Sequence, residues 1–537
     1  MGVQTAGNQT ETQDAVVVGA GFSGLYMIYR LSRMGLKVRG FEGGDGVGGT
    51  WYWNRYPGAR CDVESLQYSY GFSDERAQEW DWTERYSAQP EILAYLEYAA
   101  KKFDLLRHFQ FDTRVTSAHF DESGGRWRVE TDRGDVVEAR YVIMATGCLS
   151  STNIPVIPGQ DSFAGEVYHT GQWPHHEVDF SGKRVGIIGT GSSSVQSVPE
   201  VAKQAAHLTV FQRTPNFSVP ARNHPMDPGF QADIKSRFGE FRANLKDLPL
   251  ACFETAGAAS AIAESEQQRT ERYEDYWQRG GLIFMGAYAD LLTNEASNAT
   301  AADFVRNKIR EIVDDPAIAE KLCPDHVIGC KRPCSDTGYY ETFNRDNVSL
   351  VDLMATPIEM ITPQGVQIAG ETIELDCLIY ATGFDAMTGS LDKIDIRGRD
   401  GARLKDKWAP GPRTYLGLLS VGFPNLFTVT GPGSPAVLAN MVIAGEQHVD
   451  LICSCIEHVK ANDKALIEPS QEAETDWGER VDRYANATLY PTCNSWYMGA
   501  NIPGKPRVFL PYIGGFPNYV KTCEEIVEDD FRGFVLS

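Results

Sequence analysis

Two glycine-rich turns, each directly after a short apolar run, most constrain the fold of this chain. The first turn, Gly19 to Gly24, follows the apolar run Ala15 to Val18. Apolar residues then recur at helical spacing from Leu25 to Met34, and a second apolar run ends at Glu42. Strand, glycine turn, helix and strand in this order predict a dinucleotide-binding unit, in which a pyrophosphate lies at the helix N-terminus. Glu42 is expected to accept hydrogen bonds from a ribose.

The second turn, Gly189 to Ser194, follows the apolar run Arg184 to Ile188. Ser replaces the third glycine, and it is small enough to keep the helix close to the strand. The next predicted strand, Leu208 to Phe211, is followed by Arg213 instead of an acidic residue. An arginine there favours the 2′-phosphate of NADP over the 2′-hydroxyl of NAD. Two such units on one chain indicate a flavin enzyme that takes electrons from a nicotinamide.

An Ala-Thr-Gly sequence occurs twice, each time after an apolar run. Ala145-Thr146-Gly147 follows Tyr141 to Met144, and Ala381-Thr382-Gly383 follows Leu378 to Tyr380. Small residues after a strand let the backbone pass close to a bound dinucleotide. The repeat predicts two copies of one architecture, one of them interrupted.

The expected fold is α/β, with two Rossmann-like dinucleotide-binding domains, for FAD and NADP, and a helical insertion. Aromatic residues at helical intervals in the insertion, such as Tyr273, Tyr276 and Trp277, are interpreted as core. The predicted parts are a disordered tail (1–13), an FAD-binding domain (14–155 and 386–537), an NADP-binding domain (156–220 and 331–385), the insertion (221–330) and a lid loop near 490–510.

The composition of the chain excludes several classes of binding partner. The 537 residues carry a formal net charge of −22, which argues against nucleic acid and anionic membranes. No apolar run is long enough for a membrane span, and the N-terminus lacks a signal-peptide pattern, so a cytoplasmic location is expected. The eleven cysteines show no Cys-x-x-Cys spacing and are interpreted as reduced thiols. A disulfide or metal role for Cys330 with Cys334, or for Cys453 with Cys455, is the less favoured alternative, and no metal site is predicted.

Two longer motifs carry a family resemblance. Phe163, Gly165, His169, Trp173 and Pro174 precede the second glycine turn, and Gly48-Gly49-Thr50-Trp51 is followed by Tyr56-Pro57-Gly58 and Asp62. With these motifs, roughly residues 14 to 530 resemble the type I Baeyer–Villiger monooxygenases. Flavin monooxygenases that act on amines and sulfides, and N-hydroxylases, have similar motifs but usually lack the tryptophan ending and the Asp62 pattern.

The resemblance implies a reaction. NADPH reduces FAD, O2 adds at the flavin C4a carbon, and the resulting peroxide attacks a ketone, which gives an ester or lactone. Arg332, in Lys331-Arg332-Pro333, would stabilise the peroxyflavin and the tetrahedral oxyanion, because arginine keeps its charge at neutral pH. Asp62 would orient Arg332. An ion pair of purely structural role is the alternative.

Further roles follow from the same resemblance. Lys331 would join Arg213 and Thr214 on the NADP 2′-phosphate. Trp496 would cover the nicotinamide and the substrate as part of the lid. His169 is interpreted as structural, although a general base is conceivable. Ala436, Val437 and Leu438 would line the ketone pocket together with Trp496, with core packing as the alternative.

The complete prediction of cofactor-binding residues is Gly19, Gly21, Phe22, Ser23, Gly24, Glu42, Gly49, Thr50, Trp51, Asp62, Tyr68, Gly189, Thr190, Gly191, Ser192, Ser193, Gln196, Arg213, Thr214, Lys331, Arg332 and Trp496. Three other functions stay open: a flavin monooxygenase that oxidises nitrogen or sulfur, a pyridine-nucleotide reductase, and a nucleotide sensor. The missing Cys-x-x-Cys disfavours the reductase, and a sensor leaves Asp62 and Arg332 unexplained. The sequence does not determine the ketone, the selectivity or the oligomeric state.

Overall fold

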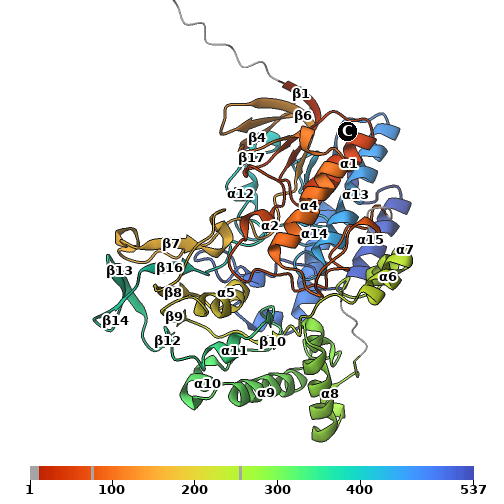
Figure 1. Cartoon of the computed structure of the whole chain (residues 1–537). Coiled ribbons are helices and arrows are strands. Elements are labelled where there is room, and N and C mark those ends of the chain that lie inside the picture. Colours follow the sequence, from red (N-terminus) through yellow and green to blue (C-terminus); the bar gives the residue numbers. More distant parts are fainter. Residues whose placement is uncertain (1–10, 74–77, 253–256) are drawn as a thin grey trace, which may run out of the picture.

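The computed structural model describes residues 11–73, 78–252 and 257–537. It contains two units, the first built on a mixed sheet with parallel strands at its centre and the second on a parallel sheet. In Figure 1 the red and orange strands of the first sheet lie above the second sheet, and the green helices of the insertion lie below it. Among the described residues, no helix is both long and apolar enough to cross a membrane.

The first sheet has the predicted strand–turn–helix–strand unit at its centre. β1 (Glu11–Val18) lies between β2 (Val38–Phe41) and β6 (Val136–Met144) and is parallel to both. Helix α1 (Phe22–Arg33) packs against α13 (Met441–Ala461). The remaining strands of the sheet are β3 (Phe109–Gln110), β4 (Val115–Asp121), β5 (Arg126–Thr131), β17 (Asp395–Arg397) and β18 (Leu426–Thr428).

β1 begins earlier than the sequence suggests. Glu11, Thr12 and Gln13 are paired with the start of β6, so the prediction of a disordered tail that extends to residue 13 is wrong for these three residues. Main-chain hydrogen bonds do not depend on apolar side chains, and the apolar pattern that marked the strand therefore missed its polar start. The rest of the predicted tail, residues 1–10, lies outside the described residues.

The second sheet has the order β12-β9-β8-β16-β7. The second glycine turn connects β8 (Arg184–Ile188) to α5 (Ser192–Ala202), and β9 (His207–Gln212) follows that helix. β12 (Val348–Asp352) and β16 (Cys377–Tyr380) come from much later in the chain and are parallel to β9 and β8. The second copy of the architecture is thus interrupted, as expected, and an unpredicted antiparallel sheet of β13 (Ile358–Thr362), β14 (Gly365–Ile368) and β15 (Glu371–Glu374) is attached to it.

The insertion between the two parts of this unit is helical. It contains α6 (Pro228–Ser236), α7 (Phe238–Lys246), α8 (Glu266–Arg279), α9 (Glu295–Ile312) and α10 (Pro316–Leu322). Tyr273, Tyr276 and Trp277 of α8 are buried in the main hydrophobic core, which confirms their interpretation as core residues. Short strands flank the insertion: β10 (Ser218–Pro220) and β11 (Cys334–Asp336) pair in parallel.

Candidate active site

The first glycine turn lies directly against the first Ala-Thr-Gly sequence. Gly19 has φ +105°, and a Cβ there would lie 2.5 Å from the carbonyl oxygen of Ala145. At Gly24 a Cβ would overlap the carbonyl oxygen of Gly19, so only glycine lets α1 start so close to the strand. The Gly48-Gly49-Thr50-Trp51 motif packs on the same turn, since a Cβ at Gly49 would lie 2.9 Å from the Cα of Gly21. The two sequence motifs therefore form one backbone surface.

Glu42 is fixed beside this turn. Its side chain is buried, and its two carboxylate oxygens accept hydrogen bonds from the N–H groups of Ala20 (2.8 Å) and Gly44 (2.9 Å). Burial raises the pKa of Glu42, and the two N–H donors oppose that effect. Each carboxylate oxygen keeps a further lone pair. The position and the remaining acceptor capacity fit the ribose contact that the sequence predicts.

Other predicted residues of the first unit surround the turn. Phe22 contacts the ring of Tyr68 edge-on, with centroids 5.2 Å apart, and Trp51 Nε1 donates to the Tyr68 hydroxyl (3.3 Å). Thr50 begins the short helix α2 (Thr50–Trp53). Ser23 faces α13, where a Cβ at Gly445 would lie 2.6 Å from Ser23 Oγ. These side chains lie around one turn, although they come from separate motifs.

The second glycine turn repeats the arrangement. Gly189 has φ +112°, and a Cβ there would overlap the carbonyl oxygen of Ala381 in the second Ala-Thr-Gly sequence. A Cβ at Gly191 would meet no atom within 4 Å, so the space beside the helix N-terminus is open. Thr190 Oγ1 donates to the carbonyl oxygen of Thr214 (2.7 Å). This open approach fits a pyrophosphate.

Helix α5 connects the second unit to other motifs. Ser192 is its first residue, and the hydroxyls of Ser193 and Thr170 lie 3.0 Å apart. Gln196 Nε2 donates to the carbonyl oxygen of Arg60 (3.0 Å), close in sequence to Asp62. This contact of Gln196 connects α5, which follows the second glycine turn, to the segment 48–62, which packs on the first glycine turn.

The Phe163–Pro174 segment forms part of the second sheet. Its centre is strand β7 (Glu166–His169), which pairs with β16. His169 Nδ1 accepts from the N–H of Gly171 (2.9 Å), its Nε2 lies 3.4 Å from Thr382 Oγ1, and burial lowers the pKa of the ring. The Trp173 N–H contacts the carbonyl oxygen of Trp53 (3.3 Å). The segment joins the two units, and His169 has the geometry of a structural cap.

A cavity of ≈ 690 Å³ lies beside the second turn. Among its lining residues are Arg213, Thr214 and Lys331. Burial lowers the pKa of Lys331, and the neighbouring charge of Arg213 lowers it further. Two acidic residues, Glu295 and Asp325, also line the cavity. Two cations that face the same cavity fit a phosphate dianion.

Arg332 and Asp62 form a bidentate ion pair. Arg332 Nε donates to Asp62 Oδ2 (2.7 Å) and Nη2 donates to Oδ1 (3.0 Å), while Nη1 donates to the carbonyl oxygen of Val437 (3.2 Å). Both side chains keep 24% of their surface exposed. Burial would lower the pKa of Arg332, but the carboxylate outweighs it and holds that pKa well above the ordinary value. The guanidinium is a permanent, fixed positive charge.

Val437 has an unusual backbone conformation. Its φ is +61°, a region that β-branched residues rarely adopt, and this conformation accompanies the contact of its carbonyl oxygen with Arg332. Ala436, Val437 and Leu438 are buried in one apolar cluster, and none of them lines the cavity described above. The contact of this cluster with Arg332 is the hydrogen bond from Nη1 to the Val437 carbonyl oxygen.

The predicted lid contributes a residue that the sequence did not suggest. Tyr497 lies buried beside Arg332; burial raises the pKa of its hydroxyl to about 12, against the opposing charge of the guanidinium. Trp496 is half-buried, packs on the cluster of Ala436, Val437 and Leu438, and contacts the Tyr497 ring (centroids 4.1 Å apart). The only sequence signal for Tyr497 was its place next to Trp496 in the loop motif.

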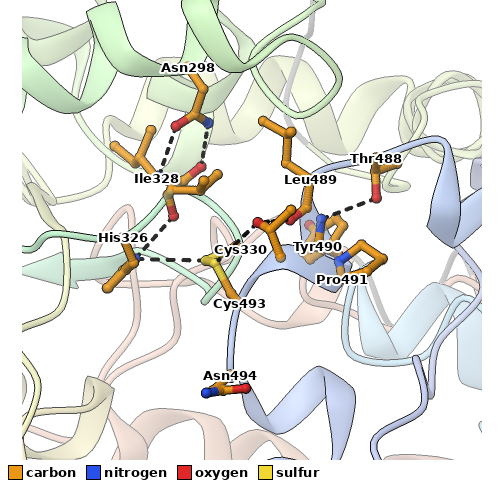
Figure 2. The surroundings of a disulfide bond; sticks show 12 residues. Asn298, His326, Ile328, Cys330, Thr488, Leu489, Tyr490, Pro491, Cys493 and Asn494 are labelled. Atoms are coloured by element: carbon orange, nitrogen blue, oxygen red, sulfur yellow. Dashed lines mark hydrogen bonds between the residues drawn. A yellow bond between two sulfur atoms is a disulfide. The ribbon is translucent and has the colours of Figure 1, made fainter.

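The prediction that all cysteines are reduced thiols is wrong for two of them. Cys330 forms a disulfide with Cys493, and Figure 2 shows it with its surroundings. The partners are 163 residues apart, so spacing along the chain gave no indication of the pair. Cys334, Cys453 and Cys455 are free and buried.

Comparisons with known proteins agree with this geometry. A family described as flavin-binding monooxygenase-like matches residues 12–254. The 2-oxo-Δ3-4,5,5-trimethylcyclopentenylacetyl-CoA monooxygenase of Pseudomonas putida is 43% identical over 98% of either chain. A Baeyer–Villiger monooxygenase of Pseudooceanicola batsensis is 42% identical, over 100% of this chain and 98% of its own length. A phenazine N-monooxygenase of Lysobacter antibioticus is 42% identical over 97% of either chain.

Among solved structures, an oxidised steroid monooxygenase bound to NADP is similar over 98% of this chain and 99% of its own, with 52% identity and a TM-score of 0.94. This similarity extends over nearly the full length of both chains. The chain belongs to the Baeyer–Villiger monooxygenases.

Proposed function

We propose that the protein uses NADPH and O2 to oxidise ketones to esters or lactones, with FAD at the first glycine turn and NADP(H) at the second. In this proposal residues 14–155 and 386–537 form the FAD-binding domain. Residues 156–220 and 331–385 form the NADP(H)-binding domain. The proposal includes a cytoplasmic location, since NADPH is regenerated there. The bound flavin supplies the chemistry of electron and oxygen transfer. The protein must bind both cofactors, orient them, and stabilise negative charge on oxygen.

The Arg332–Asp62 pair carries the proposal. Asp62 follows the motif that packs on the first turn, and Lys331, next to Arg332, lines the cavity beside the second turn. In this proposal the guanidinium lies between the two cofactor sites. Its charge is opposite to that of the oxyanion that forms when an oxygen nucleophile adds to a ketone. One such donor contributes about 3–4 kcal/mol to transition-state stabilisation.

Asp62 acts as a positioning residue in this proposal. By accepting from Nε and Nη2, it fixes the plane of the guanidinium and leaves Nη1 on the side of Val437. Trp496 and Tyr497 cover the same region from the lid side and exclude water, which would otherwise compete for the charge. Ala436, Val437 and Leu438 form the apolar wall for the ketone.

Arg332→Ala tests the proposal. The purified holoenzyme is mixed with NADPH, O2 and cyclic, aromatic, aliphatic and steroidal ketones, and products are identified by mass. The wild type should add one oxygen atom to at least one ketone. Arg332→Ala should still show flavin bleaching by NADPH under anaerobic conditions but should form no ester. Ester formation by the variant at the wild-type rate would refute the role of Arg332.

Oxidation of nitrogen is a second candidate, because the phenazine N-monooxygenase is as similar to the chain as the Baeyer–Villiger relative. A nucleophilic nitrogen attacks an electrophilic oxygen directly, so no oxyanion forms on the substrate. The two reactions separate in one experiment with a ketone and a heteroaromatic amine. A wild type that forms only the N-oxide would favour the second candidate.

A further inference from the structure

The Cys330–Cys493 disulfide connects two segments that both belong to the proposed active site. Cys330 directly precedes Lys331 and Arg332, and Cys493 lies at the start of the loop 490–510 that carries Trp496 and Tyr497. The two Cα atoms are 6.1 Å apart (Figure 2). A covalent bond therefore connects the segment that carries Lys331 and Arg332 to the lid loop.

The same bond joins two walls of the ≈ 690 Å³ cavity. One wall comes from Arg213, Thr214, His326 and Lys331, and the other comes from Thr492, Asn494 and Asn501 of the lid. Cys493 is among the residues that line the cavity, which is the space that the proposed function gives to NADP(H), and 6% of its surface is exposed. Reduction or oxidation of this disulfide would therefore change the distance between the two walls of the cavity.

Each wall is also held without the disulfide. On the first wall, Asn298 Nδ2 donates to the carbonyl oxygen of Ile328 (2.8 Å), and the Ile328 N–H donates to Asn298 Oδ1 (3.0 Å). On the second wall, Asn501 Nδ2 donates to the carbonyl oxygen of Phe384 (2.8 Å), and Lys505 forms an ion pair with Asp385. Cleavage of the bond would leave both segments folded and remove the covalent link between them, while the contact of Tyr497 with Arg332 remains.

His326 lies beside the bond in an arrangement that suits thiol chemistry. Its Nδ1 is 3.7 Å from Cys330 Sγ, and its ring lies between the carbonyl oxygens of Val327 (3.0 Å from Nδ1) and Pro215 (3.2 Å from Nε2). Burial and the charge of Lys331 lower the pKa of the His326 ring, so a thiol at Cys330 would meet a neutral ring, whose Nδ1 can accept its hydrogen bond.

We propose that Cys330 and Cys493 form a reversible redox site that controls NADP(H) binding, an inference that rests on the proposed role of the cavity. Reduction by a dithiol breaks the S–S bond; two electrons and two protons pass to the cysteines, and the dithiol becomes a disulfide. Hydrogen peroxide reverses the change: two thiols and one H2O2 give the disulfide and two molecules of water. The oxidised form holds the walls together and binds NADP(H) more tightly.

Linkage makes the effect reciprocal. If oxidation of the pair tightens NADP⁺ binding by some factor, bound NADP⁺ favours the disulfide over the dithiol by the same factor. NADP⁺ in the cavity also blocks the approach of a dithiol to Cys493. We expect a factor of about ten, within the usual range of coupling between two sites.

The test starts with a thiol count on the purified, unfolded holoenzyme. Nine free thiols are expected before reduction and eleven after it. The Kd for NADP⁺ is then measured on the native oxidised and dithiothreitol-reduced enzyme by titration calorimetry, with circular dichroism as a check on folding. Reduction should weaken binding about tenfold, reoxidation by peroxide should restore it, and NADP⁺ should slow reduction.

Two variants complete the design. Cys493→Ser should show the weaker Kd without reductant and no response to dithiothreitol. Cys323→Ser, at a free and half-buried cysteine of the insertion, should respond as the wild type does. Eleven free thiols before reduction, or equal Kd values in the two redox states, would overturn the inference. Neither result touches the proposed function, which fails only if the oxidised wild type forms no ester with NADPH.

Discussion

The Tyr56 hydroxyl donates a hydrogen bond to Gln196 Oε1 over 2.8 Å and so joins the loop before Asp62 to helix α5 of the second unit. The same loop is close-packed on α5, since a Cβ at Gly58 would overlap the carbonyl oxygen of Gln196. Asp62 is therefore fixed relative to both glycine turns. The proposed role of Arg332 between the two cofactors depends on this contact between the loop and α5.

Asp62→Asn should lower ester formation without abolishing flavin reduction. The amide keeps one acceptor oxygen but loses the charge, so the guanidinium is less well oriented. We expect kcat for ester formation to fall on the order of 10²-fold, while anaerobic flavin bleaching by NADPH stays near the wild-type rate. Asp233→Asn is the control, because Asp233 pairs with Arg237 on the protein surface. Equal losses in both half-reactions would argue for a merely structural pair.

Arg213→Ala and Lys331→Ala should each raise the KM for NADPH. Removal of a cation that contacts a phosphate costs about 1.5–3 kcal/mol, which corresponds to roughly 10- to 100-fold. The KM for NADH should hardly change, because NADH has no 2′-phosphate. Steady-state kinetics with both nucleotides measure the ratio of the KM for NADPH to the KM for NADH in each variant. A parallel rise for NADH would show that these cations do not recognise the phosphate.

Gly24→Ala should impair folding and FAD retention. The new Cβ would overlap the carbonyl oxygen of Gly19, and such overpacking costs about 1–3 kcal/mol. Gly239→Ala is the matched control, since a Cβ there meets nothing within 4 Å and the residue lies in helix α7. Urea unfolding and the flavin content of the purified proteins measure both effects. Equal stability of the two variants would contradict the packing argument.

His448 should make the protein less stable in acid. Burial lowers its pKa to about 3, and its Nδ1 accepts from the N–H of Thr430 while Nε2 contacts the Tyr519 hydroxyl (2.7 Å). The unfolded chain binds the proton near pH 6.5 and the folded one does not, so stability is lost as the pH falls below 6.5. Between pH 6.5 and 5 the loss from this group is about 2 kcal/mol.

His448→Gln serves as the comparison for this prediction, because the amide can accept from Thr430 and donate to Tyr519 but does not titrate. Urea unfolding at pH 7.5, 6.5, 5.5 and 5 gives the two stability profiles. The wild type should lose more stability than the variant toward pH 5, whatever the other histidines contribute to both. Parallel profiles would show that His448 is not the group responsible.

Local patterns in the sequence were sufficient for the central elements of the fold. The glycine turns, Glu42 and both Ala-Thr-Gly sequences depend on backbone geometry within a few residues, so each could be predicted. Strand β7 could not, because its partner β16 lies more than two hundred residues away. The Cys330–Cys493 bond and the approach of Tyr497 to Arg332 likewise depend on tertiary contacts between distant segments.

The parallel pairing of β10 with β11 has a consequence for how such enzymes diversify. Ser218 and Cys334 are register partners, so the chain leaves the second unit for the insertion and returns to it within one short strand. Between these ends, helix α7 of the insertion is held to the first unit by the buried ion pair between Arg242 and Glu446, and His326 of the insertion lines the cavity beside the second unit. A change in the insertion therefore reaches both nucleotide-binding units, which limits how far its sequence can vary without an effect on either proposed cofactor site.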